Sequence, residues 1–244
     1  MGVGTGARTH YLKSILRQMK TYINLGWLLL ITFFFDIQLT HITMNKLDLT
    51  KVFKRYYTAA SVPELVTIEK GLFVTITGKG DPNGAVFAEC TAALYAVAYG
   101  IKFSSKQKGV DFTVSKLEGF WWVDNYNVDP LTVPRDQWHY ELAIRLPDEV
   151  TQQQFSESVL SAEKKKKSAY IREVDFKHIE EGWSVQLLHT GPFSEEPVSL
   201  KKMDDFMQQQ GLQMNGRHHE IYLSDFRKTA PEKLKTILRH PVKK

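Results

Sequence analysis

The stretch His218–Asp225 has the sequence His-His-Glu-Ile-Tyr-Leu-Ser-Asp and alternates between polar and apolar side chains. Ile221 and Leu223 point to one side, and the other side carries a mainly polar set: His218, Glu220, Tyr222 and Ser224. A period of two is typical of a β-strand with one face on a core. The polar face holds a carboxylate beside a phenol and an imidazole. We therefore predict that Glu220 and Tyr222 lie at the bottom of a pocket.

The elements around this strand follow one another in the same order twice. The first half, residues 63–146, predicts strands at 64–68, 72–77, 112–123 and 138–146, with a helix at 82–100 before the third strand. A helix at 151–167 opens the second half, residues 151–244, which predicts strands at 174–179, 183–189, 218–225 and 235–240 and a helix at 197–210. The pattern predicts an α+β fold of two strand-helix-strand-strand units related by a pseudo-twofold axis. We expect an antiparallel sheet with helices on one face and a ligand cleft on the other.

The repeat also predicts what faces the first strand. Aligning Leu117–Trp122 with His219–Ser224 places Glu118 on Glu220 and Phe120 on Tyr222. On this alignment the cleft is completed by Glu118, Phe120 and Trp122, with Trp121 on the opposite, core face. Trp138 and Tyr140 are candidates for a further wall, with core packing as the alternative for at least one of them.

Composition excludes several classes of function. The net charge is +5, but its excess is concentrated in local runs such as Lys164–Lys167. These runs lack the interleaved aromatics of a nucleic-acid surface, so we expect no nucleic-acid partner. The lone Cys90 allows no intrachain disulfide and is read as a buried thiol in a cytoplasmic protein. Histidine spacing fits no metal site, and no cofactor is predicted.

The N-terminal segment differs from the rest of the chain. Residues 1–43 contain scattered basic residues and an apolar run at residues 25–35, which is shorter than the ~20 residues that span a bilayer. We interpret 1–43 as an extension outside the fold and 44–244 as the domain. A signal or membrane-associated segment is the alternative, whereas no membrane contact is expected for the domain itself. Residues 45–62 are polar, basic and aromatic, and are predicted to pack on the outside.

From Lys51 onward the chain resembles the GyrI-like small-molecule-binding family, in particular its stand-alone bacterial members. The motifs that carry the resemblance occur in family order: Thr77–Asn83, Ala93–Tyr99, Leu117–Trp122, His189–Pro192, His218–Asp225 and Lys228–Leu234. No DNA-binding domain accompanies them, because residues 1–43 show no helix-turn-helix pattern. The resemblance therefore disfavours a transcription factor.

The resemblance implies a cleft that holds a glutamate among aromatic residues, and these roles fall on Glu220, Tyr222 and the pair Trp121 and Trp122. Related domains bind lipophilic cations in a multidrug-binding cleft, and some stand-alone members hydrolyse strained cyclopropane-bearing electrophiles in detoxification. We expect a small organic ligand or substrate. The first hypothesis is binding of amphipathic or cationic molecules, with Glu220 as counter-charge. The second is hydrolysis with Glu220 as general base, and the third, on analogy alone, is a topoisomerase-inhibitor-like partner module. No oligomeric state is predicted.

Overall fold

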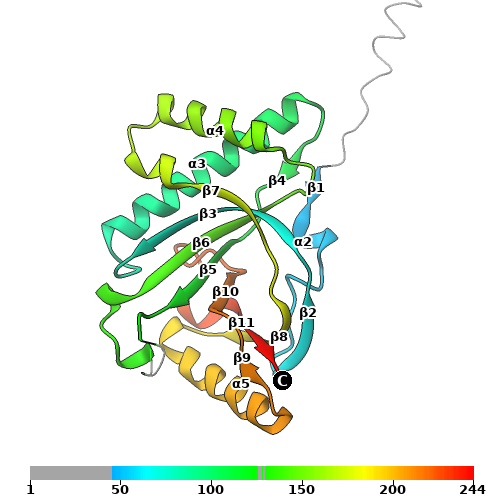
Figure 1. Cartoon of the computed structure of the whole chain (residues 1–244), viewed down its shortest axis with the longest axis vertical. Helices are drawn as coiled ribbons and strands as arrows, with labels where there is room; N and C mark the ends of the chain where they lie inside the picture. The colour runs from blue at the N-terminus through cyan, green and yellow to red at the C-terminus, as the bar shows by residue number, and fades with distance from the viewer. Residues whose placement is uncertain (1–45, 126–127, 129) are drawn as a thin grey trace, which may run out of the picture. The chain divides into compact units, whose positions relative to one another are not determined.

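The computed structural model describes residues 46–125, 128 and 130–244, and a nine-stranded antiparallel sheet organises them (Figure 1). Eight strands form one path in the order β2-β8-β11-β10-β5-β6-β3-β7. Their bounds are β2 Glu64–Ile68, β3 Gly71–Lys79, β5 Leu117–Trp122, β6 His139–Leu146, β7 Asp175–Ile179, β8 Gly182–Thr190, β10 His218–Tyr222 and β11 Lys235–Lys243. β9 (Gln213–Met214) pairs with β11, while β1 (Leu47–Asp48) and β4 (Phe112–Thr113) form a separate parallel pair.

Helices complete the expected α+β fold class, which the structure confirms. α3 (Ala85–Gln107) and α4 (Gln152–Lys165) pack together over one half of the sheet, and α5 (Glu196–Gln210) covers the other half (Figure 1). The short α2 (Leu49–Val52) precedes the sheet. Five 3₁₀ turns connect the described elements: η1 Pro130–Thr132, η2 Arg135–Gln137, η3 Ala169–Glu173, η4 Phe193–Glu195 and η5 Pro231–Lys233.

The two halves of the sheet meet where β5 pairs with β10, and they exchange their first strands. β2, from the first half, pairs with β8, and β7, from the second half, pairs with β3. The strand order therefore reads the same outward from the β5–β10 pair in both directions, as a pseudo-twofold repeat requires.

The sheet has two chemically different faces. Its outer face carries the helices: the apolar side chains of α3 pack on Val74 and Leu142, and those of α5 pack on Leu187 and Leu238. On its inner face, side chains from both edge strands, Ile68 of β2 and Ile179 of β7, pack in one cluster. Because opposite edges of the sheet contribute to the same cluster, this face is the inside of a curled half-barrel.

The N-terminal segment of the domain fills the inside of the curl. Leu49, Tyr56 and Tyr57 are buried there against Phe120 and Ile221. The prediction that residues 45–62 pack on the outside is wrong, because the long helices cover only the outer face and the inside of the curl needs other apolar side chains to fill it.

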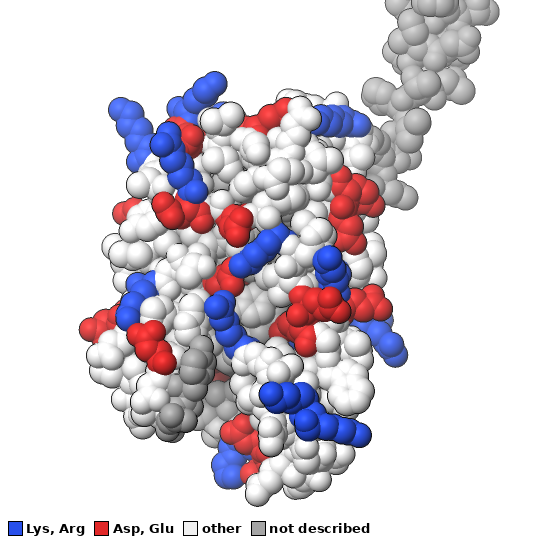
Figure 2. Space-filling view, in the orientation of Figure 1, with Lys and Arg blue, Asp and Glu red and all other residues white. Residues whose placement is uncertain are grey.

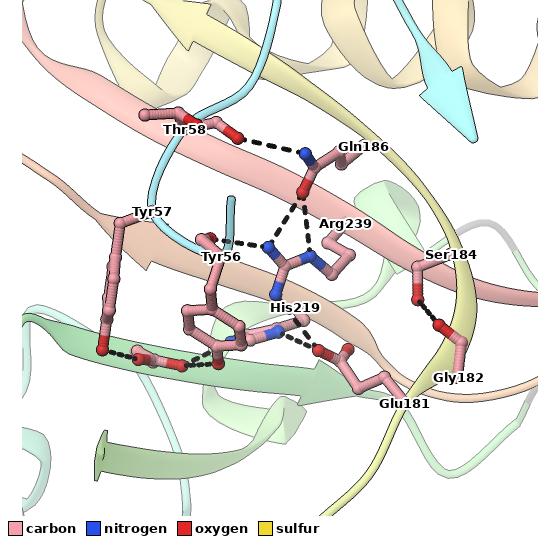
Figure 3. A network of polar contacts seen from close by, with 10 residues as sticks. Tyr56, Tyr57, Thr58, Glu181, Gly182, Ser184, Gln186, His219 and Arg239 are labelled. Atoms are coloured by element: carbon pink, nitrogen blue, oxygen red, sulfur yellow. Dashed lines mark hydrogen bonds and ion pairs between the residues drawn. The ribbon is translucent and has the colours of Figure 1, made fainter. Parts of the chain in front are cut away.

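A buried polar network ties this segment to the sheet (Figure 3). Tyr56 Oη donates a 2.5 Å hydrogen bond to Glu118 Oε2, and His219 Nε2 lies 3.1 Å from the same oxygen. The other nitrogen of His219, Nδ1, lies 3.0 Å from Glu181 Oε2, and Arg239 Nη1 donates to that oxygen at 3.3 Å. Both Glu118 and His219 are fully buried. The network continues to Gln186 of β8 through Arg239, so it spans four neighbouring strands.

Opposite charges fix the protonation of this network. Although burial opposes ionisation, the charge of His219 and then that of Arg239 lower the pKa of Glu181 to about 2. Burial also disfavours the charged imidazole, but the Glu181 carboxylate raises the pKa of His219 above its usual value. Because the pKa of Glu181 is lowered in the folded state, the ionised Glu181 stabilises the fold at pH values above the usual glutamate pKa. This stabilisation is lost as the pH falls towards 2. The protonated His219 stabilises the fold at pH values below the usual histidine pKa. This stabilisation is lost as the pH rises through the raised pKa of the folded state.

Among the element boundaries that differ from the sequence prediction, three have a clear local reason. α3 runs past Gly100 because a Cβ there would lie 3.0 Å from Ser158 Cβ of α4, so this glycine serves helix packing rather than helix termination. α3 begins after Gly84 instead of at Pro82, since the Asp81 carboxylate accepts from the Asn83 amide and closes a turn. The predicted strand 112–123 is two strands, because β4 pairs with β1 and not with the sheet.

α3 is, by length and composition, the one helix among the described residues that could cross a membrane. Its most apolar window has 44% of its residues buried inside the fold, and Leu94 and Val97 pack in the core on β3 and β6. The apolar run at 25–35 lies outside the described residues.

We predict that Glu118→Ala destabilises the fold by about 3–5 kcal/mol, because it leaves buried His219 and two tyrosine hydroxyls without their acceptor. Urea unfolding monitored by circular dichroism measures the change. The control is Glu157→Ala, an exposed position on α4 where the expected change is within about 0.5 kcal/mol. Equal stabilities of the two variants would contradict the prediction.

Candidate functional site

Glu220 lies on the helix-covered outer face of the sheet, at the seam between the two halves. It pairs with Gly119 of β5 and with Leu238 of β11, and Leu238 packs in the α5 cluster. The expectation that Glu220 lies on the face away from the helices is therefore wrong. The candidate site is the part of the outer face between α3 and α5.

The register also separates Glu118 from Glu220. Ile221, not Glu220, pairs with Glu118, so Glu118 lies on the inner face. The predicted alignment of the repeats was shifted by one residue, and a shift of one residue moves every side chain of a strand to the other face. Glu118 takes part in the inner network instead of facing Glu220.

Trp121 and Tyr222 form the floor of the site next to Glu220. Trp121 Nε1 donates to Tyr222 Oη at 3.1 Å, and both side chains are buried. Gly119 makes this arrangement possible, because a Cβ at this position would lie 2.8 Å from Trp121 Nε1 and 2.9 Å from Tyr222 Oη. Burial, followed by the negative charge of Glu220, raises the pKa of Tyr222 well above its usual value. The Tyr222 phenol thus stays protonated and can act as a hydrogen-bond donor.

Aromatic side chains from the surrounding elements line the space around this floor. Phe87, in the first turn of α3, stacks on Trp121 with ring centroids 6.0 Å apart. Phe193, in η4 just before α5, meets Tyr222 edge-to-face at 6.0 Å, and Phe226 meets both of these rings. A pocket of about 530 Å³ opens beside the floor, and its lining includes five aromatic residues: Phe87, Tyr95, Tyr99, Tyr222 and Phe226.

A chain of two histidines holds the Glu220 carboxylate. His218 Nε2 lies 3.1 Å from Glu220 Oε1, and His218 Nδ1 lies 2.9 Å from His240 Nε2. Burial, followed by the charge of His218, lowers the pKa of His240 to about 3, so His240 is neutral. His240 Nδ1 is buried with no hydrogen-bond partner among the described residues. Because an ionised carboxylate only accepts hydrogen bonds, His218 donates to Glu220 through Nε2.

Glu196 brings a second carboxyl group to the site. It is the first residue of α5 and is 8% exposed. Its Oε1 atom is buried without a hydrogen-bond partner among the described residues. Burial and then the charge of Glu220 raise the pKa of Glu196 to about 10. The neighbour predicted for Glu220 was Glu118, and Glu196 occupies that role in the structure.

The remaining predicted residues divide between the two faces. Phe120 and Trp122 lie on the inner face with Glu118: Phe120 stacks on His219 at 4.0 Å, and Trp122 lies between His139 and Arg217. Trp121, expected in the core, is the member of the tryptophan pair that reaches the site. Trp138 meets Trp121 edge-to-face, 6.1 Å between centroids. Tyr140 lies beneath Phe87 and is fully buried, so it belongs to the core.

The sequence analysis missed several residues of the site, among them Phe87, Phe193, Glu196 and His240. The repeat contained a signal for the first three, since Phe87 and the pair Phe193 and Glu196 both follow a Gly-containing turn at the start of a helix. If both helices begin over the seam, their first turns border the cleft. His240 gave no such signal, because its contact with His218 depends on the register of β10 with β11. Within the described chain, no group of three or more His, Cys, Asp or Glu residues could hold a metal ion.

An antiparallel half-barrel of two repeats with an aromatic pocket at the seam is the architecture of a small-molecule-binding domain. The sequence profile of the GyrI-like small molecule binding domain matches residues 61–243. The chain belongs to this family. No curated protein sequence matches the chain.

Several solved structures resemble the chain over most of its length. An uncharacterized conserved protein from Listeria innocua is 40% identical with a TM-score of 0.76, covering 81% of this chain and 100% of that chain. A structure of a hydrolase from Listeria innocua is 38% identical with a TM-score of 0.74, covering 82% and 100%. A further hydrolase structure from the same organism is 39% identical, with a TM-score of 0.72 and coverage of 81% and 100%. The C-terminal domain of EcmrR, 11% identical at a TM-score of 0.51 over 75% and 97% of the chains, shares the fold alone.

We predict that Gly119→Ala costs about 1–3 kcal/mol of stability, because the added methyl group forces Trp121 and Tyr222 apart. The cost should be smaller in a Trp121→Phe/Tyr222→Phe background, which lacks the two atoms that the methyl group would meet. Chemical unfolding of the four proteins measures this coupling. An equal loss of stability in both backgrounds would show that the contact between Trp121 and Tyr222 does not depend on the absence of a side chain at Gly119.

Proposed function

We propose that the cleft between α3 and α5 binds small amphipathic or cationic organic molecules, with Glu220 as the counter-charge. One observation carries the proposal: the Glu220 side chain is 12% exposed and pairs with no lysine or arginine among the described residues, while Tyr222 beside it meets the rings of Phe193 and Phe226. Glutamates on the inner face do form ion pairs: Glu181 pairs with Arg239, and Glu141 pairs with Lys177 and Arg217.

An uncompensated carboxylate in an aromatic site suits a ligand that supplies the missing positive charge. Burial strengthens the attraction, because the local dielectric is lower than that of water. The faces of Tyr222 and Trp121 add cation–π attraction for the same kind of ligand. The face in Figure 2 carries basic and acidic side chains interspersed, with no single basic surface of the kind that nucleic acids favour.

We predict that Glu220→Gln weakens binding of ethidium, a planar aromatic monocation, by roughly tenfold or more, equivalent to at least about 1.4 kcal/mol. Fluorescence titration measures the dissociation constant. Glu195→Gln is the matched control, because Glu195 is exposed at the same helix start and should leave the affinity unchanged. Equal affinities of wild type and Glu220→Gln would refute the counter-charge role.

The second candidate is a hydrolase of strained cyclopropane-type electrophiles, and the similarity to two Listeria innocua structures named as hydrolases favours it. In this role Glu220 takes a proton from a water molecule as the water oxygen attacks the ring carbon. Tyr222 and Trp121 position the substrate. The same carboxylate therefore serves both candidate functions.

We predict multiple turnovers when the protein is incubated with an excess of a spirocyclopropyl cyclohexadienone, followed through loss of the dienone absorbance. Glu220→Gln should reduce the rate by ~10²-fold or more, the usual scale of general-base catalysis. Release of at most one equivalent of product per protein would reject the enzyme and leave the binding function.

A further inference from the structure

Glu196 differs from the other buried glutamates in having nothing to neutralise it. Glu118, Glu141 and Glu181 each meet a histidine, lysine or arginine within the described part of the fold. Glu196 is 8% exposed and forms no described ion pair, and its Oε1 atom has no described hydrogen-bond partner. An ionised carboxylate in that position would lose its hydration without compensation, which costs several kcal/mol per ion.

Glu196 also lies where the charge of Glu220 reaches it. Phe193, three residues before Glu196, meets Tyr222 with ring centroids 6.0 Å apart, and Tyr222 lies on the same face of β10 as Glu220. The two carboxyl groups have unequal partners, since His218 donates to Glu220 and no described residue donates to Glu196 Oε1. The carboxyl group that has a donor keeps its negative charge more readily than the one that has none.

The titratable groups on the neighbouring elements are consistent with a neutral Glu196 beside a charged Glu220. On β10, His218 and Tyr222 flank Glu220, and on β11 the neutral His240 stands behind His218. His189 of β8 lies beside the start of α5, but its Nδ1 and Nε2 atoms are held by Ser199 Oγ and the Pro192 carbonyl oxygen. None of these groups brings a fixed positive charge to Glu196.

We propose that Glu196 and Glu220 form one functional pair in which Glu196 carries a proton and Glu220 carries the charge, so that the cleft presents a carboxylic acid beside a carboxylate. The identity of the ligand rests on the function proposed above, whereas the protonation of Glu196 does not. Burial and the charge of Glu220 act in the same direction, since they raise the pKa of Glu196 to about 10.

The pair selects ligands by charge. With one negative charge between them, the two groups match an organic molecule with a single positive charge. They disfavour anions, which would meet Glu220 without compensation. The Glu196 O–H adds a hydrogen-bond donor, so the preferred ligand also carries an oxygen or nitrogen acceptor close to its cationic or electron-poor centre.

For the hydrolytic candidate, the pair would divide the work of ring opening in a cyclopropane conjugated to a carbonyl. Glu220 takes a proton from water while the water oxygen bonds to the ring carbon. The ring C–C bond breaks, its electron pair moves through the conjugated system to the carbonyl oxygen, and the Glu196 proton is transferred to that oxygen. The sum is addition of one water molecule, and transfer of the proton from Glu220 to Glu196 restores the pair.

Infrared difference spectroscopy on the unliganded protein tests the proposal directly. The spectrum of wild type minus Glu196→Gln at neutral pH should contain the carbonyl band of a protonated carboxylic acid, and this band should disappear near pH 10. The difference between wild type and the control Glu195→Gln should lack it. Absence of the acid band from the first difference spectrum overturns the proposal, whatever the protein binds.

A second measurement tests whether the two groups act as a pair. In Glu220→Gln the acid band should persist at neutral pH, because burial remains, but should disappear at a lower pH than in wild type. An unchanged midpoint overturns the pairing. Wild-type affinity for ethidium should rise as Glu196 ionises above pH 9, and Glu196→Gln should lack this rise. If wild type shows the acid band but binds no ethidium, the protonation of Glu196 stands and the proposed cation-binding function fails.

Discussion

The pairing of β5 with β10 is the constraint on which the rest of the structure depends. It joins the two halves of the sheet, and its register decides which polar side chains meet. Glu118 and His219 turn to the inside of the curl, where they are closed off from water. Glu220 and Tyr222 turn to the helix-covered face, where Tyr222 lines a pocket together with Phe87 and Phe226. The same two strands thus carry Glu118, which meets His219 and two tyrosine hydroxyls, and Glu220, which meets no lysine or arginine within the described fold.

The contrast between the faces separates stability from function. On the inner face Glu118, Glu141 and Glu181 each meet a histidine, lysine or arginine, and Tyr56 and Tyr57 bind the N-terminal segment to Glu118 (Figure 3). Such a network holds one arrangement, because removing any member leaves another buried and unsatisfied. On the outer face, Glu196 and Glu220 lack such cations. A protein tolerates this cost where a ligand or a reaction makes use of it.

Much of the fold could be predicted from the sequence, because strand alternation and helix periodicity are local. Ile221 and Leu223 marked the strand, and the repeat gave the symmetry of the sheet. The face on which each side chain lies could not be predicted. An alignment of the two repeats that is wrong by one residue keeps the alternating pattern but moves every side chain of the strand to the other face of the sheet. Glu220 and Tyr222 lie on one face as expected, whereas Trp121 was assigned to the core, Glu118 was placed on the wrong face and Glu196 was missed. The position of Glu196 depends on where α5 crosses the sheet, which no short motif encodes.

The exchange of β2 and β7 has a consequence for how the molecule can form and vary. Each half lends its first strand to the edge of the other, so neither half completes its own part of the sheet. These pairings join residues a hundred or more positions apart, which delays them in folding, because long loops must close before the contacts form. The seam that holds Glu220 therefore lies at the centre of the sheet, with strands from both halves of the chain on each side of it.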